Sequence, residues 1–269
     1  MAEEGQQRLA VDDEARAILR EWMLAARRGS AAPAPPVVSA SPAAVPAPAP
    51  AVSQPAADAM STEEKLALLR GKAEHWKAAR RLGTLRETMV FAVGNPHARL
   101  MLVGEAPGYD EERLREPFVG RAGQLLNRML QAMGLSREEV YISNVCKFRP
   151  AMGDNQGTAN RPPTPEETAA CLPLILAEIR AVRPACIVCL GGSSAKGLLN
   201  MPPDTSVSSL RGRWLECQGV PVRVTYHPSY LLRNEALSAR RSVWEDMLAA
   251  MERLGMPISD KQRRYFLPS

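Results

Sequence analysis

Four side chains that could take part in chemistry lie close to short apolar stretches of this 269-residue sequence. Glu105 directly follows one stretch, Asn144 lies near the end of the next, His227 follows another, and Phe118 stands in the segment after Glu105. A carboxylate and a histidine can transfer protons, a carboxamide can donate and accept hydrogen bonds, and a phenyl ring can stack on another flat group. Each residue alone has an ordinary structural explanation as a turn residue or a loop cap. Their shared position favours a common site.

The segments that must position these side chains alternate between strands and helices. Short apolar runs predict strands at residues 98–104, 140–145, 185–191 and 220–226. Helical patterns cover residues 62–82, 120–134, 164–182 and 236–254, and a further short helix ends at Leu199. This alternation is typical of the α/β class, in which helices cover both faces of a parallel sheet. Ligands of such sheets bind beyond the carboxyl ends of the strands.

Composition divides the chain into three parts. Residues 29–57 contain eight prolines and no charged residue, which predicts an extended, disordered linker. Residues 1–28 precede the linker and include a short amphipathic helix at 9–28, which either docks on the main domain or a partner or is only half formed. Residues 58–269 are the expected folded domain.

Charge and cysteine content narrow the class of protein. Residues 58–269 carry 29 basic and 23 acidic side chains, a net charge of +6 that is compatible with nucleic acid binding but common in other proteins. The sequence has no apolar run of about 18 residues, so no membrane span is expected. The acidic N-terminus lacks the apolar core of a secretory signal, and five cysteines are an odd number. These features favour a reducing cytoplasm, and we separately expect the protein to be a monomer.

Several motifs in this order resemble one family. GEAPG, PFVGRAGQLL, VYISNV, KFRP and YHPSYLLRN, spread from about Val90 to Asp246, are similar to the uracil-DNA glycosylase superfamily, above all to its family-4 branch. The resemblance implies a three-layer α/β/α domain with a four-stranded parallel sheet. It also implies a repair enzyme that flips uracil out of DNA and hydrolyses its glycosidic bond with water, leaving an abasic site.

The resemblance assigns a role to each side chain of the suspected site. Phe118 would stack on uracil, Asn144 would read its N3–H and O4, and His227 would face its O2. Glu105 and Glu111 both match acidic positions of the first motif, and Glu105 is slightly preferred for positioning the attacking water. The full substrate-binding set that the motifs imply is Gly104, Ala106, Gly108, Phe118 and Asn144.

The same resemblance implies contacts with DNA. Leu231, Leu232 and Arg233 match the loop that enters the minor groove, where an apolar wedge and a cation keep the base flipped. Ser229 belongs to that motif. Residues 191–194, including Ser193, either offer backbone N–H groups to a phosphate or form a plain strand-to-helix turn.

The chain departs from the family at the positions of an iron–sulfur cluster. Similar family-4 enzymes have four cysteine ligands, where this sequence has Lys77, Arg80, Phe148 and Cys171. A cluster needs about four thiolates, so we expect neither a metal nor another cofactor. Cys146 is expected to lie in a strand and point to the opposite face. Lys77 and Arg80 are expected to fill the site by pairing with carboxylates or DNA phosphate.

The remaining cysteines have no recognisable ligand spacing. Cys186 and Cys189 form a CxxC inside an apolar strand, where side chains three residues apart project to opposite faces. Cys217 stands alone near a predicted turn. All three are interpreted as structural thiols.

Two local differences concern the loops. Residues 151–163 are longer than the corresponding link of the family and contain Asn160 and Arg161, where a relative that bonds covalently to DNA has a histidine. We therefore expect no covalent intermediate. Arg115 replaces a family glycine.

Three functions are compatible with these observations. The first is a monofunctional uracil-DNA glycosylase without a cluster. The second is a module that binds DNA or abasic sites and has lost efficient catalysis. A different small-molecule hydrolase on the same sheet is the third, and no motif favours it.

Overall fold

The computed structural model describes residues 60–153 and 155–267. The chain divides into two compact units, residues 1–61 and 62–269, and the account below concerns the second. The helix expected within residues 1–28 and the linker expected at 29–57 lie outside the described residues.

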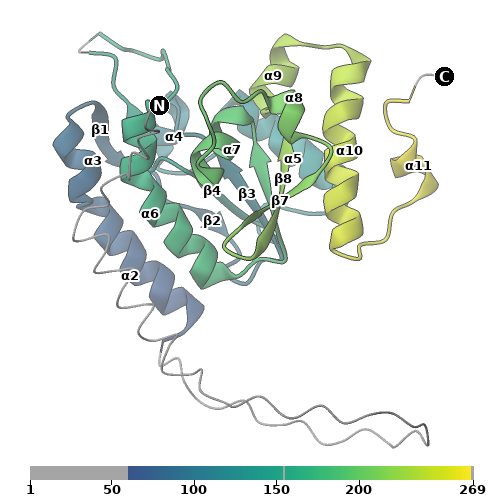
Figure 1. Ribbon diagram of the computed structural model, residues 1–269, viewed down its shortest axis with the longest axis horizontal. Coiled ribbons are helices and arrows are strands. Elements are labelled where there is room, and N and C mark those ends of the chain that lie inside the picture. Colours follow the sequence, from purple (N-terminus) through teal and green to yellow (C-terminus); the bar gives the residue numbers. More distant parts are fainter. Residues whose placement is uncertain (1–59, 154, 268–269) are drawn as a thin grey trace, which may run out of the picture. The chain divides into compact units, whose positions relative to one another are not determined.

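A mixed sheet of six strands forms the centre of the domain, in the order β2-β4-β3-β6-β8-β7 (Figure 1). Its four inner strands are parallel: β4 (Tyr141–Asn144), β3 (Leu100–Gly104), β6 (Cys186–Leu190) and β8 (Val220–Thr225). These are the four strands that the apolar runs predict, so that prediction is confirmed. The expected sheet was too small, because β2 (Val93–Gly94) and β7 (Trp214–Cys217) add antiparallel edges.

A second, two-stranded sheet stands apart from the first. It pairs β1 (Leu85–Met89) with β5 (Phe148–Pro150) in antiparallel orientation. Because β5 follows β4 after only three residues, this small sheet is joined directly to the carboxyl end of β4.

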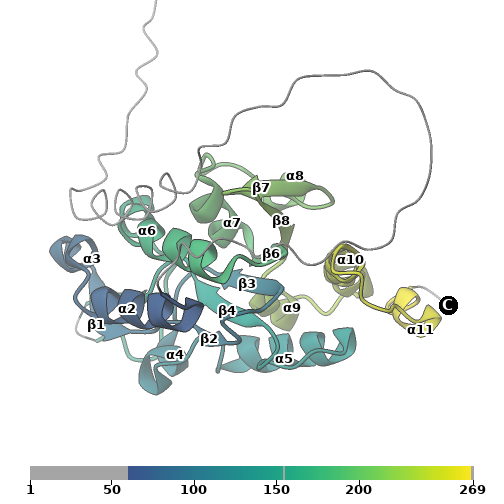
Figure 2. The ribbon, with the colours of Figure 1, turned by 90° about the horizontal axis from the view of Figure 1, so that it is seen from below.

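Helices cover both faces of the large sheet (Figures 1 and 2), which confirms the three-layer α/β/α architecture. One face carries α6 (Pro165–Val182) and α7 (Gly192–Leu199), and the other carries α5 (Arg121–Met133) and α10 (Leu237–Arg253). The helices α2 (Thr62–Glu74) and α3 (Lys77–Leu82) pack against α6. The shorter helices are α4 (Tyr109–Leu114), α8 (Val207–Leu210), α9 (Pro228–Arg233) and α11 (Asp260–Arg263).

The single helix predicted at residues 62–82 is wrong, because the chain breaks into α2 and α3 at Trp76. This residue has extended backbone angles (φ −63°, ψ 101°), and its side chain is buried. Its indole Nε1–H donates to the carbonyl of Ala170 in α6 at 2.6 Å. Burial of the indole therefore outweighs the continuous helical pattern of the sequence.

The start of α6 follows its predicted signal. Thr164 Oγ1 accepts from the Glu167 N–H at 3.2 Å, while Glu167 Oε2 accepts from the Thr164 N–H at 2.8 Å. This reciprocal capping box, with Pro165 next to it, explains why the helix begins there.

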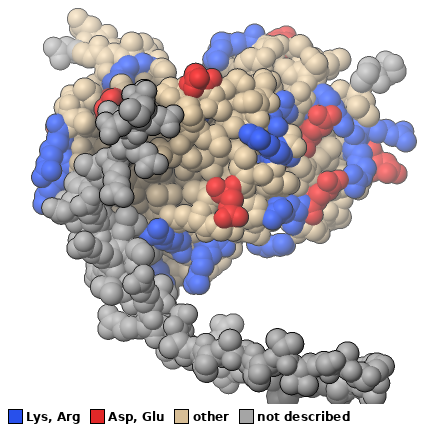
Figure 3. Space-filling view, viewed as in Figure 1, with Lys and Arg blue, Asp and Glu red and all other residues tan. Residues whose placement is uncertain are grey.

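Basic and acidic side chains are interspersed on the face shown in Figure 3. The net positive charge of residues 58–269 is therefore not gathered into one patch on this face. None of the described helices is long and apolar enough to cross a membrane.

Candidate active site

A pocket of about 530 Å³ opens at the carboxyl ends of the parallel strands. It brings together most of the residues that the sequence singles out: Glu105, Ala106, Gly108, Glu111, Phe118, Asn144, Ser193, His227, Ser229 and Arg233. Gly104 lies next to the pocket, whereas Leu231 and Leu232 do not line it. Asn160 and Arg161 of the long loop after β5 also line the pocket.

Asn144 is the last residue of β4 and is only 2% exposed. It pairs in register with Gly104 at the end of β3. A Cβ on Gly104 would overlap Asn144 Oδ1 and come within 2.5 Å of the Phe118 ring. Glycine at this position therefore lets the carboxamide and the ring approach each other.

A buried ionic network lies beneath Asn144. The ammonium group of Lys147, fully buried, pairs with Glu178 and donates to Ser143 Oγ at 2.6 Å and to the Asn144 carbonyl at 2.8 Å. Glu178 Oε2 also accepts from Ser143 Oγ at 2.7 Å and from the Tyr141 hydroxyl at 3.2 Å. The network fixes the backbone on which the carboxamide stands.

Phe118 holds a backbone conformation that side chains rarely adopt. Its φ is 56°, in the left-handed region, and its ring is buried. Arg137 donates to the carbonyls of Pro117 at 2.8 Å and Phe118 at 3.0 Å, and also pairs with Glu116. The guanidinium of Arg137 therefore stabilises a strained loop that places the ring in the pocket.

His227 lines the pocket, and hydrogen bonding defines which nitrogen of its ring carries the proton. Its Nδ1 accepts from the backbone N–H of Ser229 at 3.1 Å, so the ring proton must be on Nε2. Burial, followed by the nearby charge of Arg233, lowers the pKa of His227 to about 4. Its ring centroid lies 5.8 Å from that of Phe118.

The two candidate carboxylates have different surroundings. The Oε1 atom of Glu105 is buried and has no hydrogen-bond partner within residues 60–153 and 155–267. Burial raises the pKa of Glu105 above its usual value, against the opposing effects of Ser193 and Lys196. A carboxylate that acts as a general base toward a water molecule needs an oxygen without another partner and a desolvated environment.

Glu111, in contrast, uses both oxygens to hold the loops around the pocket. Its Oε1 accepts from the N–H groups of Val119 and Gly120, each at 3.0 Å, and its Oε2 accepts from Gly108 at 3.2 Å. The carboxylate thereby joins the segment after β3 to the start of α5. This geometry favours a positioning role for Glu111 over the catalytic role that the motif implies.

The long loop after β5 delivers an oriented amide to the pocket. Asn160 Oδ1 accepts from Nε of the buried Arg149 at 2.9 Å, so its Nδ2 must be the atom near Gly108. Arg149 also donates to the carbonyls of Gly157 and Ala159. The loop is therefore held in place, and Asn160 presents donors to the pocket.

Arg161 is fixed by the fold rather than available to a ligand. It donates to both oxygens of Glu167, at 2.8 and 2.6 Å, and to the carbonyls of Ala151 and Thr84. The bidentate pair connects the loop to the first turn of α6.

The expected minor-groove loop is only partly exposed. Leu231 is 8% exposed and belongs to the hydrophobic core, which contradicts its expected place in an apolar wedge. Leu232 is half-buried, and Arg233 is exposed. The segment starts with His227 as the N-cap of α9, so it forms a short helix rather than an extended loop.

The positions of the family's cluster ligands do not fit a cluster in this chain. Arg80 lies over the ring of Phe148 at 5.1 Å and donates to the carbonyls of Glu74 at 2.9 Å and Glu87 at 2.8 Å. Among residues 60–153 and 155–267, no group of three histidine, cysteine or acidic side chains could hold a metal ion. Within the described residues, Arg80 bonds to backbone carbonyls where a carboxylate partner was expected, and its pairing with DNA phosphate stays a prediction.

Cys146 also differs from expectation. It lies between β4 and β5 rather than in a strand, and a hydrogen bond to Cys171 is the main cause that raises its pKa. The two thiols are therefore neighbours. Two thiols with an arginine and a phenyl ring are still an unsuitable ligand set for iron and sulfide.

The other three cysteines are buried and free, as structural thiols should be. Burial raises the pKa of Cys186 and of Cys217 to about 11, and it raises the pKa of Cys189 further. These thiols are protonated at neutral pH, which makes them poor metal ligands.

Arg115 ends α4 with a left-handed backbone, φ 56°. This is the conformation that glycine adopts most readily, which explains why a glycine suits the position.

Sequence comparisons agree with this geometry. A family model described as the uracil DNA glycosylase superfamily matches residues 91–248. A type-4 uracil-DNA glycosylase of Thermotoga maritima is 43% identical over 165 residues, which cover 60% of this chain and 81% of the relative. The type-4 enzyme of Archaeoglobus fulgidus is 44% identical over 149 residues, covering 53% and 71%. A type-5 uracil-DNA glycosylase of Pyrobaculum aerophilum is 32% identical over 153 residues, covering 51% and 64%.

Proposed function

The chain belongs to the uracil-DNA glycosylase superfamily, and from this membership we infer that it is a DNA repair enzyme that releases uracil from DNA. It is a hydrolase of the N-glycosidic bond. The observation that supports this function most directly is the convergence of Glu105, Phe118, Asn144 and His227 on one pocket. The finer mechanism below is our proposal.

The pocket selects uracil by hydrogen bonding and stacking. The Asn144 carboxamide can accept from N3–H and donate to O4, whereas cytosine has an acceptor at N3 and a donor at N4. Cytosine would leave the buried carboxamide mispaired, which is costly. The Phe118 ring supports one face of the flipped base.

His227 stabilises the leaving group. As the bond between N1 and the sugar breaks, its electron pair moves into the ring and negative charge develops on O2. The Nε2–H of a neutral imidazole can donate to that oxygen, since Nδ1 is already an acceptor from the Ser229 N–H. Uracil leaves as an anion and takes a proton from solvent afterwards.

Glu105 activates the water. Its unpartnered Oε1 can accept the proton of a water whose oxygen bonds to C1′, and its charge stabilises the cationic sugar. The products are free uracil and an abasic site. The Asn160 amide provides donors at the edge of the pocket for the water or the sugar. Asn160 is not a nucleophile, so hydrolysis needs no covalent intermediate.

We propose that the enzyme works without an iron–sulfur cluster. The proposal is supported by Arg80 and Phe148, which stack on each other at two of the ligand positions. Iron analysis of the purified protein tests it, and stoichiometric iron would contradict it.

On the DNA side, Ser193, Ser229, Leu232 and Arg233 are the proposed contacts. We also propose a monomer in the cytoplasm, where five free cysteines stay reduced.

The test of the function is release of uracil from single- and double-stranded DNA by the purified full-length chain. We expect wild type to release uracil, Asn144→Asp to discriminate less against cytosine, and Phe118→Ala to be slower. Tight binding of uracil or abasic DNA without turnover would favour the alternative, a DNA-binding module on the same fold.

A further inference from the structure

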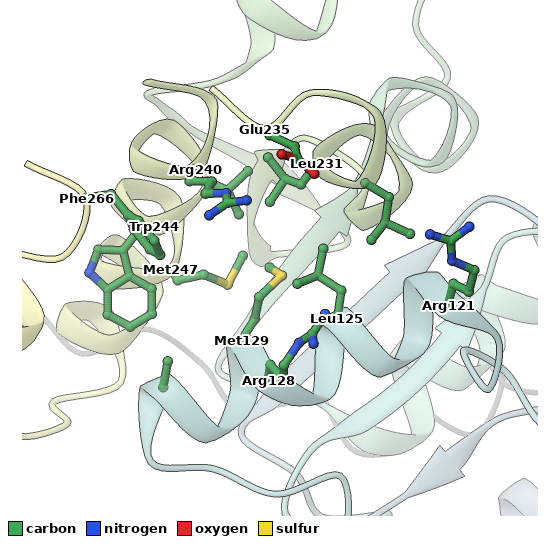
Figure 4. Close-up of a pocket in the computed structure, with 13 residues that line it drawn as sticks. Arg121, Leu125, Arg128, Met129, Leu231, Glu235, Arg240, Trp244, Met247 and Phe266 are labelled. Carbon is green, nitrogen blue, oxygen red and sulfur yellow. The ribbon is translucent and has the colours of Figure 1, made fainter. Parts of the chain in front are cut away.

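A second groove lies beside the uracil pocket, across α9. Ser229 and Arg233 of this helix line the uracil pocket, whereas Leu231 and Leu232 line the groove. The groove has a volume of about 500 Å³ and runs between α5, α9, α10 and the C-terminal segment (Figure 4). It is therefore continuous with the loop proposed to meet DNA.

The floor of the groove is apolar. Figure 4 shows Leu125 and Met129 of α5 on one side, facing Met247 of α10 and Phe266 of the C-terminal segment on the other. Phe266 is 39% exposed, which is unusual for a phenyl ring and leaves it accessible to a ligand. The floor can thus contact flat apolar surfaces.

The rim of the groove is basic. Arg121, Arg128 and Arg240 line it, and Glu235 is its single carboxylate. In the part of the chain that the structure describes, no hydrogen bond or ion pair is formed by these three guanidinium groups. They remain available for an anionic partner.

The far end of the groove is held by specific contacts, so the hollow is part of the fold. Gln262 Nε2 donates to the Ala132 carbonyl of α5 at 2.9 Å, and Trp244 Nε1 donates to the Gln262 carbonyl at 2.6 Å. Arg241 of α10 donates to the Tyr265 carbonyl at 2.9 Å. These bonds fix the segment that carries Phe266.

We propose that this groove binds the single-stranded DNA that flanks the flipped uracil. The proposal rests on the proposed function, because it assumes that α9 meets the strand that carries uracil. Phosphates match the arginine rim, and unpaired bases match the apolar floor with its phenyl ring. Bases in a duplex are stacked and paired, so only unpaired nucleotides could use the floor. The enzyme should therefore hold single strands more tightly than its phosphate contacts alone allow.

The experiment measures binding of the full-length chain to a uracil-free oligonucleotide, as a single strand and as a duplex, across a range of salt concentrations. Arg128→Gln/Arg240→Gln should weaken single-strand binding roughly tenfold. It should also lower the slope of log affinity against log salt by about 0.7 for each lost phosphate contact. Phe266→Ala should weaken single-strand binding about fivefold and leave duplex binding unchanged.

Matched variants provide the controls. Arg99→Gln/Arg180→Gln removes two charges that do not line the groove, since Arg99 precedes β3 and Arg180 lies in the last turn of α6. Leu267→Ala truncates the exposed neighbour of Phe266. Equal single-strand affinities of the groove and control variants would overturn the proposal. An equal loss on both DNA forms would also overturn it, by assigning the arginines to duplex phosphates. Uracil release by wild type, measured in parallel, tests the proposed function separately.

Discussion

At the scale of single residues, the pocket assigns different tasks to two glutamates of one motif. Among the described residues, Glu105 Oε1 is buried without a hydrogen-bond partner, whereas both oxygens of Glu111 accept from backbone N–H groups. The sequence favoured Glu105 only slightly, because both are acidic residues of one motif. Their hydrogen bonds favour the same choice more strongly.

This difference predicts distinct effects of the two amide variants. Glu105→Gln should lower kcat for uracil release by about 10²-fold or more, the usual contribution of a general base. Glu111→Gln should cost about 1–3 kcal/mol of stability, because its amide cannot accept from all three N–H groups. Single-turnover rates and denaturant unfolding measure both effects. A fully active Glu105→Gln protein would reverse the assignment.

The raised pKa of Glu105 also predicts an acid limit of activity. The carboxylate must be ionised to take a proton, so kcat should fall as pH decreases through a pKa above the ordinary value of 4.5. A pH–rate profile of wild type measures this limit. If the profile of Glu105→Gln shows the same acid limb, the limb belongs to another group.

His227 predicts a pH dependence of stability. Its pKa is about 4 in the folded chain, so the unfolded chain binds more protons between pH 4 and its usual pKa of 6.5. Stability should therefore fall as pH decreases through this window, by at most about 1.4 kcal/mol per pH unit. His227→Asn can still cap α9 but does not titrate, so its unfolding free energy should decline less steeply. Parallel curves would contradict the pKa shift.

At the scale of elements, the apolar strands of the sheet were predictable and their edges were not. Strands such as Cys186–Leu190 are buried on both faces, and that burial is visible as continuous hydrophobicity. The two-residue strand β2 carries no such signal, because pairing alone creates it. The helix predicted at residues 62–82 is interrupted at Trp76, because the indole ring of this residue is buried.

The site was predictable in its members but not in its supports. Motifs identified Phe118 and Asn144, whereas Arg137 acts through hydrogen bonds to the segment of Pro117 and Phe118 that no local pattern records. One support did leave a signal, since Glu178 interrupts an otherwise apolar helical run. A carboxylate in such a run indicates a buried partner, which is Lys147.

The loop before α5 yields a prediction about strain. Arg137→Gln removes the donors that hold the carbonyls of Pro117 and Phe118, and the left-handed Phe118 costs about 1–3 kcal/mol to maintain. The ring should then leave its position, and kcat should fall about tenfold. Arg113→Gln on the neighbouring α4, whose contact with Asp110 is exposed, is the control and should keep the wild-type rate. Equal rates in all three proteins would show that Arg137 is not needed.

At the scale of the whole molecule, α2 and α3 are attached to the domain by side chains. Trp76 bonds to α6, and Arg80 bridges the end of α2, β1 and the ring of Phe148. These contacts occupy the region where similar enzymes are expected to hold iron and sulfide. A non-covalent attachment has consequences for stability that differ from those of a metal site.

Chelators and oxidants should therefore leave the unfolding temperature of the full-length protein unchanged, since no cluster would be lost. Arg80→Ala removes two hydrogen bonds and one cation–π contact of a side chain that is itself exposed, which we estimate at about 1 kcal/mol. For a domain of this size, that loss lowers Tm by roughly 2–4 °C. Arg81→Ala, an exposed neighbour in α3, should stay within about 0.5 kcal/mol of wild type. A Tm that falls with chelator but not with Arg80→Ala would mean that a metal, and not the arginine, holds α2 and α3 on the domain.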